Sequence, residues 1–151
     1  MFKLTMRNTK SGFTLIELLV VIAIIGLLST LAVVALGSAR QKARDSLRLS
    51  DLKEMQVALE LHYTDKSSYP VQAEVVTLGS GNFACLNIDG FSASGCANPY
   101  KGNIPQDPGE SVYQYISSDG SSYAISAILE GEIGGLNDGT VQASPSGISN
   151  Q

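Results

Sequence analysis

A long stretch of apolar residues near the N-terminus constrains the fold of this chain more than any other feature. The run Leu18–Leu36 (LLVVIAIIGLLSTLAVVAL) contains nineteen residues and no charge. Together with residues 13–17 it approaches the roughly 20 residues that a helix needs to cross the apolar core of a bilayer. A lone strand could not satisfy its backbone polar groups in lipid, so we predict a transmembrane helix over residues 13–37.

Charged residues flank this segment unevenly. Lys3, Arg7 and Lys10 precede it without any acid, so the positive-inside rule places residues 1–12 in the cytoplasm and the rest of the chain outside. A secretory signal peptide begins in the same way, although its apolar region is usually only about 7–15 residues long. A plain signal anchor also fits the length and the charges. Neither explains Glu17, because an acid in a membrane segment costs about 2.5–3.5 kcal/mol at the centre and less near an end.

The distal part of the chain is acidic and contains both cysteines. From Glu54 to Gln151, eleven acids stand against two lysines. Proteins that bind nucleic acids present a basic surface, so we predict no nucleic-acid partner. Cys85 and Cys96 are too few for a zinc site built on thiolates. A disulfide formed in an oxidising compartment is favoured over the alternative, which is two buried free thiols.

The residues around Glu17 are similar to a known family. Lys10–Gly26 (KSGFTLIELLVVIAIIG) resembles the processing and methylation signature of type IV prepilins and type II secretion pseudopilins. The resemblance implies that residues 1–12 are a leader peptide, that prepilin peptidase cuts between Gly12 and Phe13, and that Phe13 is then N-methylated. It also implies an assembly role for Glu17, whose carboxylate would neutralise the Phe13 amine of a neighbouring subunit. Since neither charge is stable alone in an apolar environment, the pair would fix the axial register between helices.

The helical pattern continues beyond the membrane segment. Apolar residues recur there at spacings of three and four: Leu49, Leu52, Met55, Leu59 and Tyr63. This spacing indicates an amphipathic continuation over residues 38–66, and we predict a single helix from Thr14 to Tyr63. The basic residues from Arg40 to Arg48 either contact lipid head groups or acidic patches of neighbouring subunits, or they lie in solvent. His62 is interpreted as a packing residue.

The residues after the helix predict a small β-rich head over residues 67–142. Pro70 cannot extend the helix. Alternating residues in 111–117 and 122–130, joined by a turn centred on Asp119-Gly120, predict an antiparallel hairpin with one face packed on the helix. The predicted fold class is therefore α+β.

Two other parts of the head are expected to be irregular. Residues 78–102 hold both cysteines among many Gly, Ser and Asn residues, which indicates a variable loop with room for one short strand. Residues 143–151 are small and polar, and we expect them to form a flexible tail.

Weaker features extend the resemblance into the head. Tyr69-Pro70, the segment Ile104–Pro108 and the tyrosine-rich hairpin look like the major pseudopilin of type II secretion, which implies a pilin-like α+β fold. The long insert before Pro105 departs from that layout, so the sequence does not decide whether the chain is a subunit of a pilus or of a pseudopilus. Major pseudopilins of this kind bind calcium in a C-terminal loop, which implies Glu132 and Asp138 as metal ligands here. The family's aspartate pattern is not reproduced residue for residue.

No feature of the sequence indicates an enzyme, because the single histidine has no nucleophile beside it and no glycine loop is suited to phosphate. The leading hypothesis is a structural subunit, anchored in the bacterial inner membrane by one pass with its head outside. An assembly platform in that membrane would add it to other pilin or pseudopilin subunits, in an extracellular or periplasmic filament. The alternative is a membrane-anchored extracytoplasmic binding domain, whose acidic head would capture a ligand or a cation.

Overall fold

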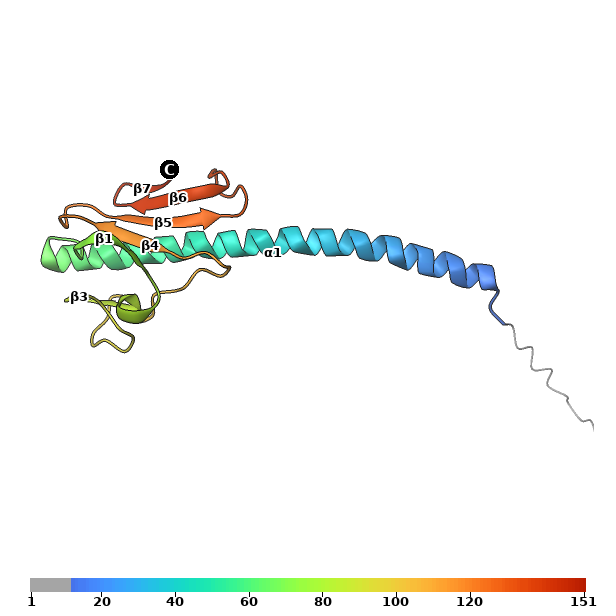
Figure 1. Ribbon diagram of the computed structural model, residues 1–151, viewed down its shortest axis with the longest axis horizontal. Coiled ribbons are helices and arrows are strands. Elements are labelled where there is room, and N and C mark those ends of the chain that lie inside the picture. Colours follow the sequence, from blue (N-terminus) through green and yellow to red (C-terminus); the bar gives the residue numbers. More distant parts are fainter. Residues whose placement is uncertain (1–11) are drawn as a thin grey trace, which may run out of the picture. The chain divides into compact units, whose positions relative to one another are not determined.

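One helix dominates the chain. A computed structural model describes residues 12–151, so the predicted leader other than Gly12 lies outside the described residues. Helix α1 runs from Leu15 to Lys66 over 52 residues (Figure 1). It contains an 18-residue window with a mean hydropathy of 2.9 and no buried residue, so by length and composition it can cross a membrane. The prediction of a single long helix is confirmed, and the helix ends at Lys66 rather than at Tyr63.

Local chemistry explains where α1 begins and ends. Thr14, just before α1, and Glu17 in its first turn exchange hydrogen bonds, the capping-box arrangement that satisfies N–H groups left free at a helix start. At the other end Ser67 adopts a left-handed backbone conformation with φ of 57°. Its N–H donates to the Tyr63 carbonyl at 2.7 Å, as in a helix C-cap. Pro70 then excludes any continuation of the helix.

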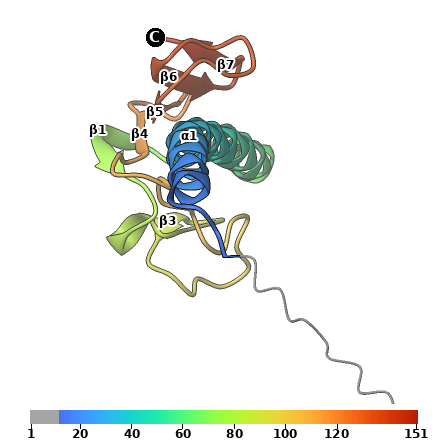
Figure 2. The same cartoon turned by 90° about the vertical axis from the view of Figure 1, so that its right-hand side faces the viewer.

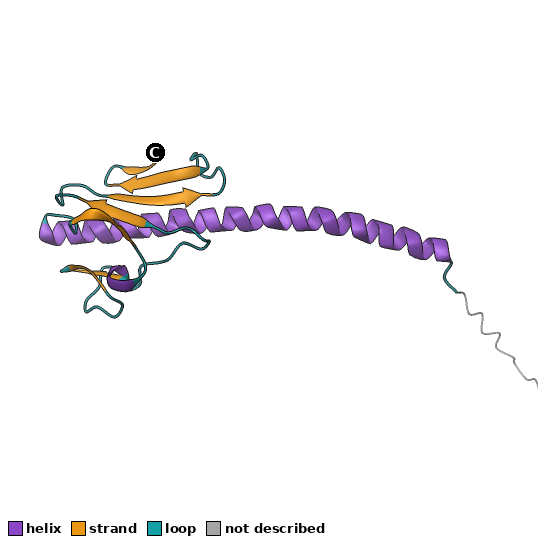
Figure 3. Ribbon diagram, viewed as in Figure 1, coloured by secondary structure: helices purple, strands orange, loops and turns teal. Residues whose placement is uncertain are grey.

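The chain divides between Ser38 and Ala39 into two compact units. We call the second, residues 39–151, the head unit. Besides the distal part of α1 it contains these elements: β1 (Gln72–Thr77), the 3-10 helix η1 (Gly81–Phe83), β2 (Cys85–Asn87), β3 (Gly90–Ser92), β4 (Gln114–Ser117), β5 (Ala124–Leu129), β6 (Gly139–Ser144) and β7 (Gly147–Asn150) (Figure 3).

The strands of the head unit form two antiparallel sheets. The larger has the order β1-β4-β5-β6-β7, and the smaller consists of β2 and β3. Seen along α1, strands of the larger sheet and β3 lie on different sides of the helix (Figure 2). Leu52, Met55 and Leu59 of α1 are at most 1% exposed and share one core with Tyr115 and Ile125 of the sheet. This is the predicted α+β architecture, with one sheet face packed on the helix.

The predicted hairpin is present, with slightly shorter strands. Strands β4 and β5 pair in antiparallel fashion, with Gln114 opposite Ser126. In the turn between them Gly120 has a φ of 76°, a left-handed conformation that glycine adopts without strain. A Cβ at this position would also lie 3.0 Å from the Tyr69 carbonyl oxygen. The turn therefore requires glycine for both its conformation and its close approach to the end of α1.

The prediction of a flexible tail over residues 143–151 is wrong. Strand β6 extends to Ser144 and pairs with both β5 and β7. Strand β7 lies entirely within the segment that was expected to be a tail. Val141 and Ala143 are fully buried, because alternate residues of β6 face the core. Only Gln142 separates these two inward residues, which are small, so the alternation was weak in the sequence. The loop expected at residues 78–102 likewise contains more regular structure than one short strand, namely η1, β2 and β3.

Candidate functional site

The cleavage bond predicted from the sequence lies in a short segment ahead of α1. Gly12, Phe13 and Thr14 belong to no helix or strand. The Phe13 side chain is 86% exposed, and apart from Gly12 and its two chain neighbours no described atom lies within 4 Å of the place where a Cβ on Gly12 would stand. The Gly12–Phe13 bond is therefore accessible to an enzyme that takes an extended chain.

Glu17 uses one of its two carboxylate oxygens within the chain. Both the N–H and the Oγ1 of Thr14 donate to Glu17 Oε2 at 2.8 Å, and the Glu17 N–H donates to Thr14 Oγ1 at 3.3 Å. Within residues 12–151, Oε1 receives no hydrogen bond. Glu17 thus caps its own helix with one oxygen and leaves the other available to a donor from outside the chain.

The apolar part of α1, as far as Leu36, presents apolar side chains on all sides. Every large apolar residue from Phe13 to Leu36 is at least 46% exposed. Such a surface is suited to lipid or to the apolar helices of other molecules.

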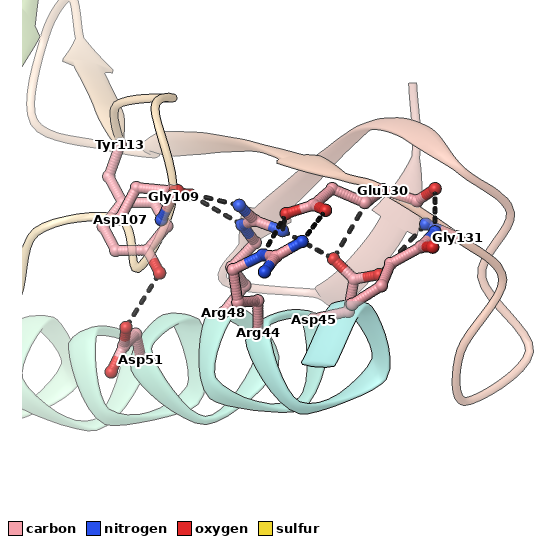
Figure 4. Close-up of polar contacts among 10 residues, drawn as sticks. Arg44, Asp45, Arg48, Asp51, Asp107, Gly109, Tyr113, Glu130 and Gly131 are labelled. Atoms are coloured by element: carbon pink, nitrogen blue, oxygen red, sulfur yellow. Dashed lines mark hydrogen bonds and ion pairs between the residues drawn. The ribbon is translucent and has the colours of Figure 1, made fainter. Parts of the chain in front are cut away.

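A partly buried cluster of charged side chains joins α1 to two loops of the head unit (Figure 4). Arg48, only 1% exposed, lies at its centre. Its guanidinium donates to both oxygens of Asp107, at 2.7 and 2.8 Å, in the bidentate geometry that makes such pairs strong. Nη1 of Arg48 also donates to Asp45 at 2.7 Å and to Glu130 at 2.8 Å.

The neighbours of Arg48 on α1 hold the chain just after β5. Asp45 is 1% exposed, and its carboxylate accepts the backbone N–H groups of Glu130 and Gly131, each at 3.0 Å. Arg44 donates to the Glu130 carboxylate through Nε at 2.7 Å and also through Nη2. This part of α1 is therefore bonded to the loop at Asp107 and to the end of the hairpin.

The arginines favour the ionised forms of Asp107 and Glu130. Hydrogen bonds from Arg44, and then from Arg48, lower the pKa of Glu130 from 4.5 to about 2. Burial by itself would raise the pKa of Asp107, but hydrogen bonds from Arg48 and from the Gly109 N–H bring this pKa below its usual value. The bond to Asp107 is the main cause of the raised pKa of Arg48. The cluster is therefore charged at neutral pH, and it loses its pairing only in acid.

These contacts correct our interpretation of the basic residues 40–48. Arg44 and Arg48 bind acids of their own head unit, whereas Arg40 and Lys42 are exposed. The sequence carried a signal for this: Asp45 and Arg48 continue, at helical spacing, the apolar face that begins at Leu49 and Leu52. Charges on a buried face need partners. The partners themselves come from distant loops, which helical spacing cannot identify.

The segment of residues 78–102, which we call the cysteine insert, is fixed to the head unit. A disulfide joins Cys85 to Cys96, whose Cα atoms lie 6.3 Å apart, and Cys85 is fully buried. The hydroxyl of Tyr100 donates to Asp65 of α1. Lys101 forms an ion pair with another α1 residue, Glu54.

His62 packs between the end of α1 and Tyr100 of the cysteine insert. It is 4% exposed, and its Nδ1 lies 2.9 Å from the Ser68 carbonyl oxygen. Its ring meets the ring of Tyr100 edge-on, with centroids 6.0 Å apart. These contacts belong to a packing residue, as the sequence indicated.

The two residues suggested as calcium ligands lie in the loop between β5 and β6. Glu132 and Asp138 are both exposed. In the described part of the chain, no three His, Cys, Asp or Glu side chains gather closely enough to hold a metal ion. Calcium binding here stays a prediction from the sequence.

Comparisons with known proteins point to the same segments. Residues 7–37 match the family model described as the prokaryotic N-terminal methylation motif. The chain is 31% identical over 135 residues to the type II secretion system core protein G of Aeromonas hydrophila, covering 87% of this chain and 92% of that protein. It is 36% identical over 107 residues to the protein of the same name from Klebsiella pneumoniae, covering 70% and 74%.

A pilus component is also among the similar proteins. The chain is 38% identical over 96 residues to the type IV wide pilus major component PilA4 of Thermus thermophilus, covering 63% of this chain and 72% of that protein. No solved structure shows a significant match to the chain.

Proposed function

This chain belongs to the family of type IV pilins and type II secretion pseudopilins and has their structural role, and we propose that it is made as a precursor, cut between Gly12 and Phe13, and assembled into a helical filament. Prepilin peptidase would make the cut, and a platform in the bacterial inner membrane would extract the subunit. Before extraction, α1 would anchor the chain with the head unit outside the cytoplasm.

The observation that carries this proposal is the state of residues 12–17. The methylation motif spans them, the Phe13 side chain is exposed, and the helix starts only at Leu15. A peptidase can therefore take the bond without unwinding α1. Glu17 remains in the first turn, with Oε1 free of partners among the described residues.

We propose that this free oxygen receives the Phe13 amine of a neighbouring subunit after cleavage. An amine and a carboxylate are each costly to bury alone, and pairing them removes most of that cost. Because the remaining segment to Leu36 is uncharged, Glu17 is the one group there that can specify the axial position of one helix against another. This amine–carboxylate pair would specify the axial register between helices more than it would add to the net stability of the filament.

Mass spectrometry of the membrane-extracted protein tests the processing step. In a host with an active prepilin peptidase, the N-terminus should be methylated Phe13. Replacing Gly12 by valine should retain Met1, because a side chain would then stand next to the scissile bond. An intact Met1 on the wild-type protein in such a host would refute the proposal and favour a permanently anchored binding domain.

A further inference from the structure

Two basic residues of α1 have no partner in the described part of the chain. Arg40 and Lys42 are exposed, and neither forms an ion pair with any residue from 12 to 151. The next two basic residues, Arg44 and Arg48, are already paired with acids of the head unit. We call Arg40 and Lys42 the free cations. Both are available to an anion from outside the chain.

The part of α1 that carries the free cations has no exposed acid. From Gly37 to Ser50 the only acid is Asp45, which is 1% exposed and accepts hydrogen bonds within the head unit. The next acid along the helix, Asp51, accepts a hydrogen bond from Tyr113. This stretch of α1 therefore adds two uncompensated positive charges to the surface.

The free cations lie at the level of the lipid head groups when α1 spans a bilayer. Head groups add roughly 5–8 Å to each side of the apolar core, which corresponds to about four or five helical residues. Arg40 and Lys42 follow Leu36, the last residue of the apolar run, by four and six residues. Side chains on a helix lean toward its N-terminus. This tilt brings both cations back toward the lipid phosphates.

The free cations lie on opposite sides of α1. Successive residues of a helix are about 100° apart, so Arg40 and Lys42 are separated by about 200° around its axis. Between them lies Gln41, whose side chain donates to the Glu130 carbonyl of the head unit. A neighbouring protein on one side of the helix could contact only one free cation. Lipids surround the helix and can contact both.

The side of α1 at Gln41 does not favour anionic lipids. The loop after β5 approaches the helix there, and it contains Glu132, whose side chain is exposed. Like charges repel, so this carboxylate opposes contact between the loop and an anionic bilayer surface. The lipid contact therefore belongs to the free cations of α1 and not to this loop.

We infer that Arg40 and Lys42 bind the phosphates of anionic phospholipids while α1 anchors the chain, in the leaflet on the side of the head unit. Guanidinium and ammonium groups both donate hydrogen bonds to phosphate. A Lys or Arg near an anionic bilayer surface favours binding by roughly fivefold, so each free cation should enrich anionic lipid beside it about fivefold. The inference rests on the proposed function, since only membrane anchoring brings these residues to the head groups.

Site-specific photo-crosslinking in the full-length protein tests this contact. A crosslinking amino acid replaces Ala43, which is exposed about one turn after Arg40, and the protein is placed in bilayers of equal phosphatidylglycerol and phosphatidylcholine. Mass spectrometry should find adducts with phosphatidylglycerol about fivefold more often than with phosphatidylcholine. A ratio near one would overturn the inference. Adducts only with a second copy of the chain would also overturn it, in favour of an acidic protein partner.

A matched pair of double variants identifies the groups responsible. Arg40→Gln with Lys42→Gln, and Lys53→Gln with Lys66→Gln, each remove two positive charges from exposed positions of α1. Only the first pair lies at head-group level, so it alone should lower the adduct ratio to about one. An unchanged ratio in the first variant, or an equal fall in both, would refute the inference.

The same bilayers separate this inference from the proposed function. Normal insertion of the wild-type chain with an unselective adduct ratio would refute the lipid contact and leave the membrane anchor intact. Failure of the wild-type chain to insert into any bilayer would refute the anchoring step of the proposed function, and this inference with it.

Discussion

Replacing Arg48 by methionine is the sharpest test of the energetics of the head unit. Methionine keeps the length and helix preference of the side chain but removes its charge and all its hydrogen bonds. The side chains of Asp45 and Asp107 are 2% and 0% exposed. Without Arg48 both would be buried carboxylates that have lost their cation.

The expected loss of stability is large for a unit of this size. Removing one member of a buried ion pair costs about 3–5 kcal/mol, because the remaining charge is left uncompensated. A domain of about 100 residues loses roughly 4 °C in Tm for each kcal/mol, so Arg48→Met should lower the midpoint by about 12–20 °C. Protonation of the freed carboxylates would place the result at the lower end of that range.

Thermal unfolding of the full-length protein in detergent micelles, followed by near-ultraviolet circular dichroism, measures this change. The signal comes from buried tyrosines such as Tyr113 and Tyr115, so it reports the head unit. Arg40→Met is the matched control, because Arg40 is exposed on the same helix and its loss should cost no more than about 0.5 kcal/mol. If the two variants melted within about 3 °C of each other, the reasoning about the buried cluster would be wrong.

Other predictions address assembly, acid and the disulfide. Glu17→Gln preserves the capping box, so it should insert into the membrane normally but enter sheared filaments poorly; a normal filament yield would contradict the register argument. The pKa of Glu130 is lowered from 4.5 to about 2, so its contribution is complete above about pH 4.5 and is lost as the pH falls toward 2. This acid-dependent loss, measured by unfolding between pH 5 and pH 2, should shrink in Arg44→Met, because Arg44 is the main cause of the lowered pKa, and an unchanged profile would exclude this pairing as its cause. Replacing Cys85 and Cys96 by alanine should lower the free energy of unfolding by about 3 kcal/mol on the loop-entropy model. A wild-type melting point that does not change when reductant is added would contradict this stabilisation by the disulfide.

Where a feature depends on neighbouring residues, the sequence predicted it. The helix was predicted from Thr14 and begins at Leu15, and the bonds between Thr14 and Glu17 at its start join residues three apart. The β4–β5 hairpin follows from alternation on both sides of Asp119-Gly120. Strand β6 was missed because its inward residues are small, so that the alternation of Val141 and Ala143 with polar residues was weak. Its place in the sheet depends on pairing with β5, which no local pattern encodes.

The sequence by itself determined that residues 18–36 are apolar enough to enter a membrane and that residues 7–37 match the prokaryotic N-terminal methylation motif. These properties depend on composition and short spacing, and they hold whatever the rest of the chain does. Only the tertiary structure decided that Arg48 is a buried centre of charge, since its partners Asp107 and Glu130 lie 59 and 82 residues away. Coulombic pairing and burial depend on distance in space, and folding alone brings those side chains together.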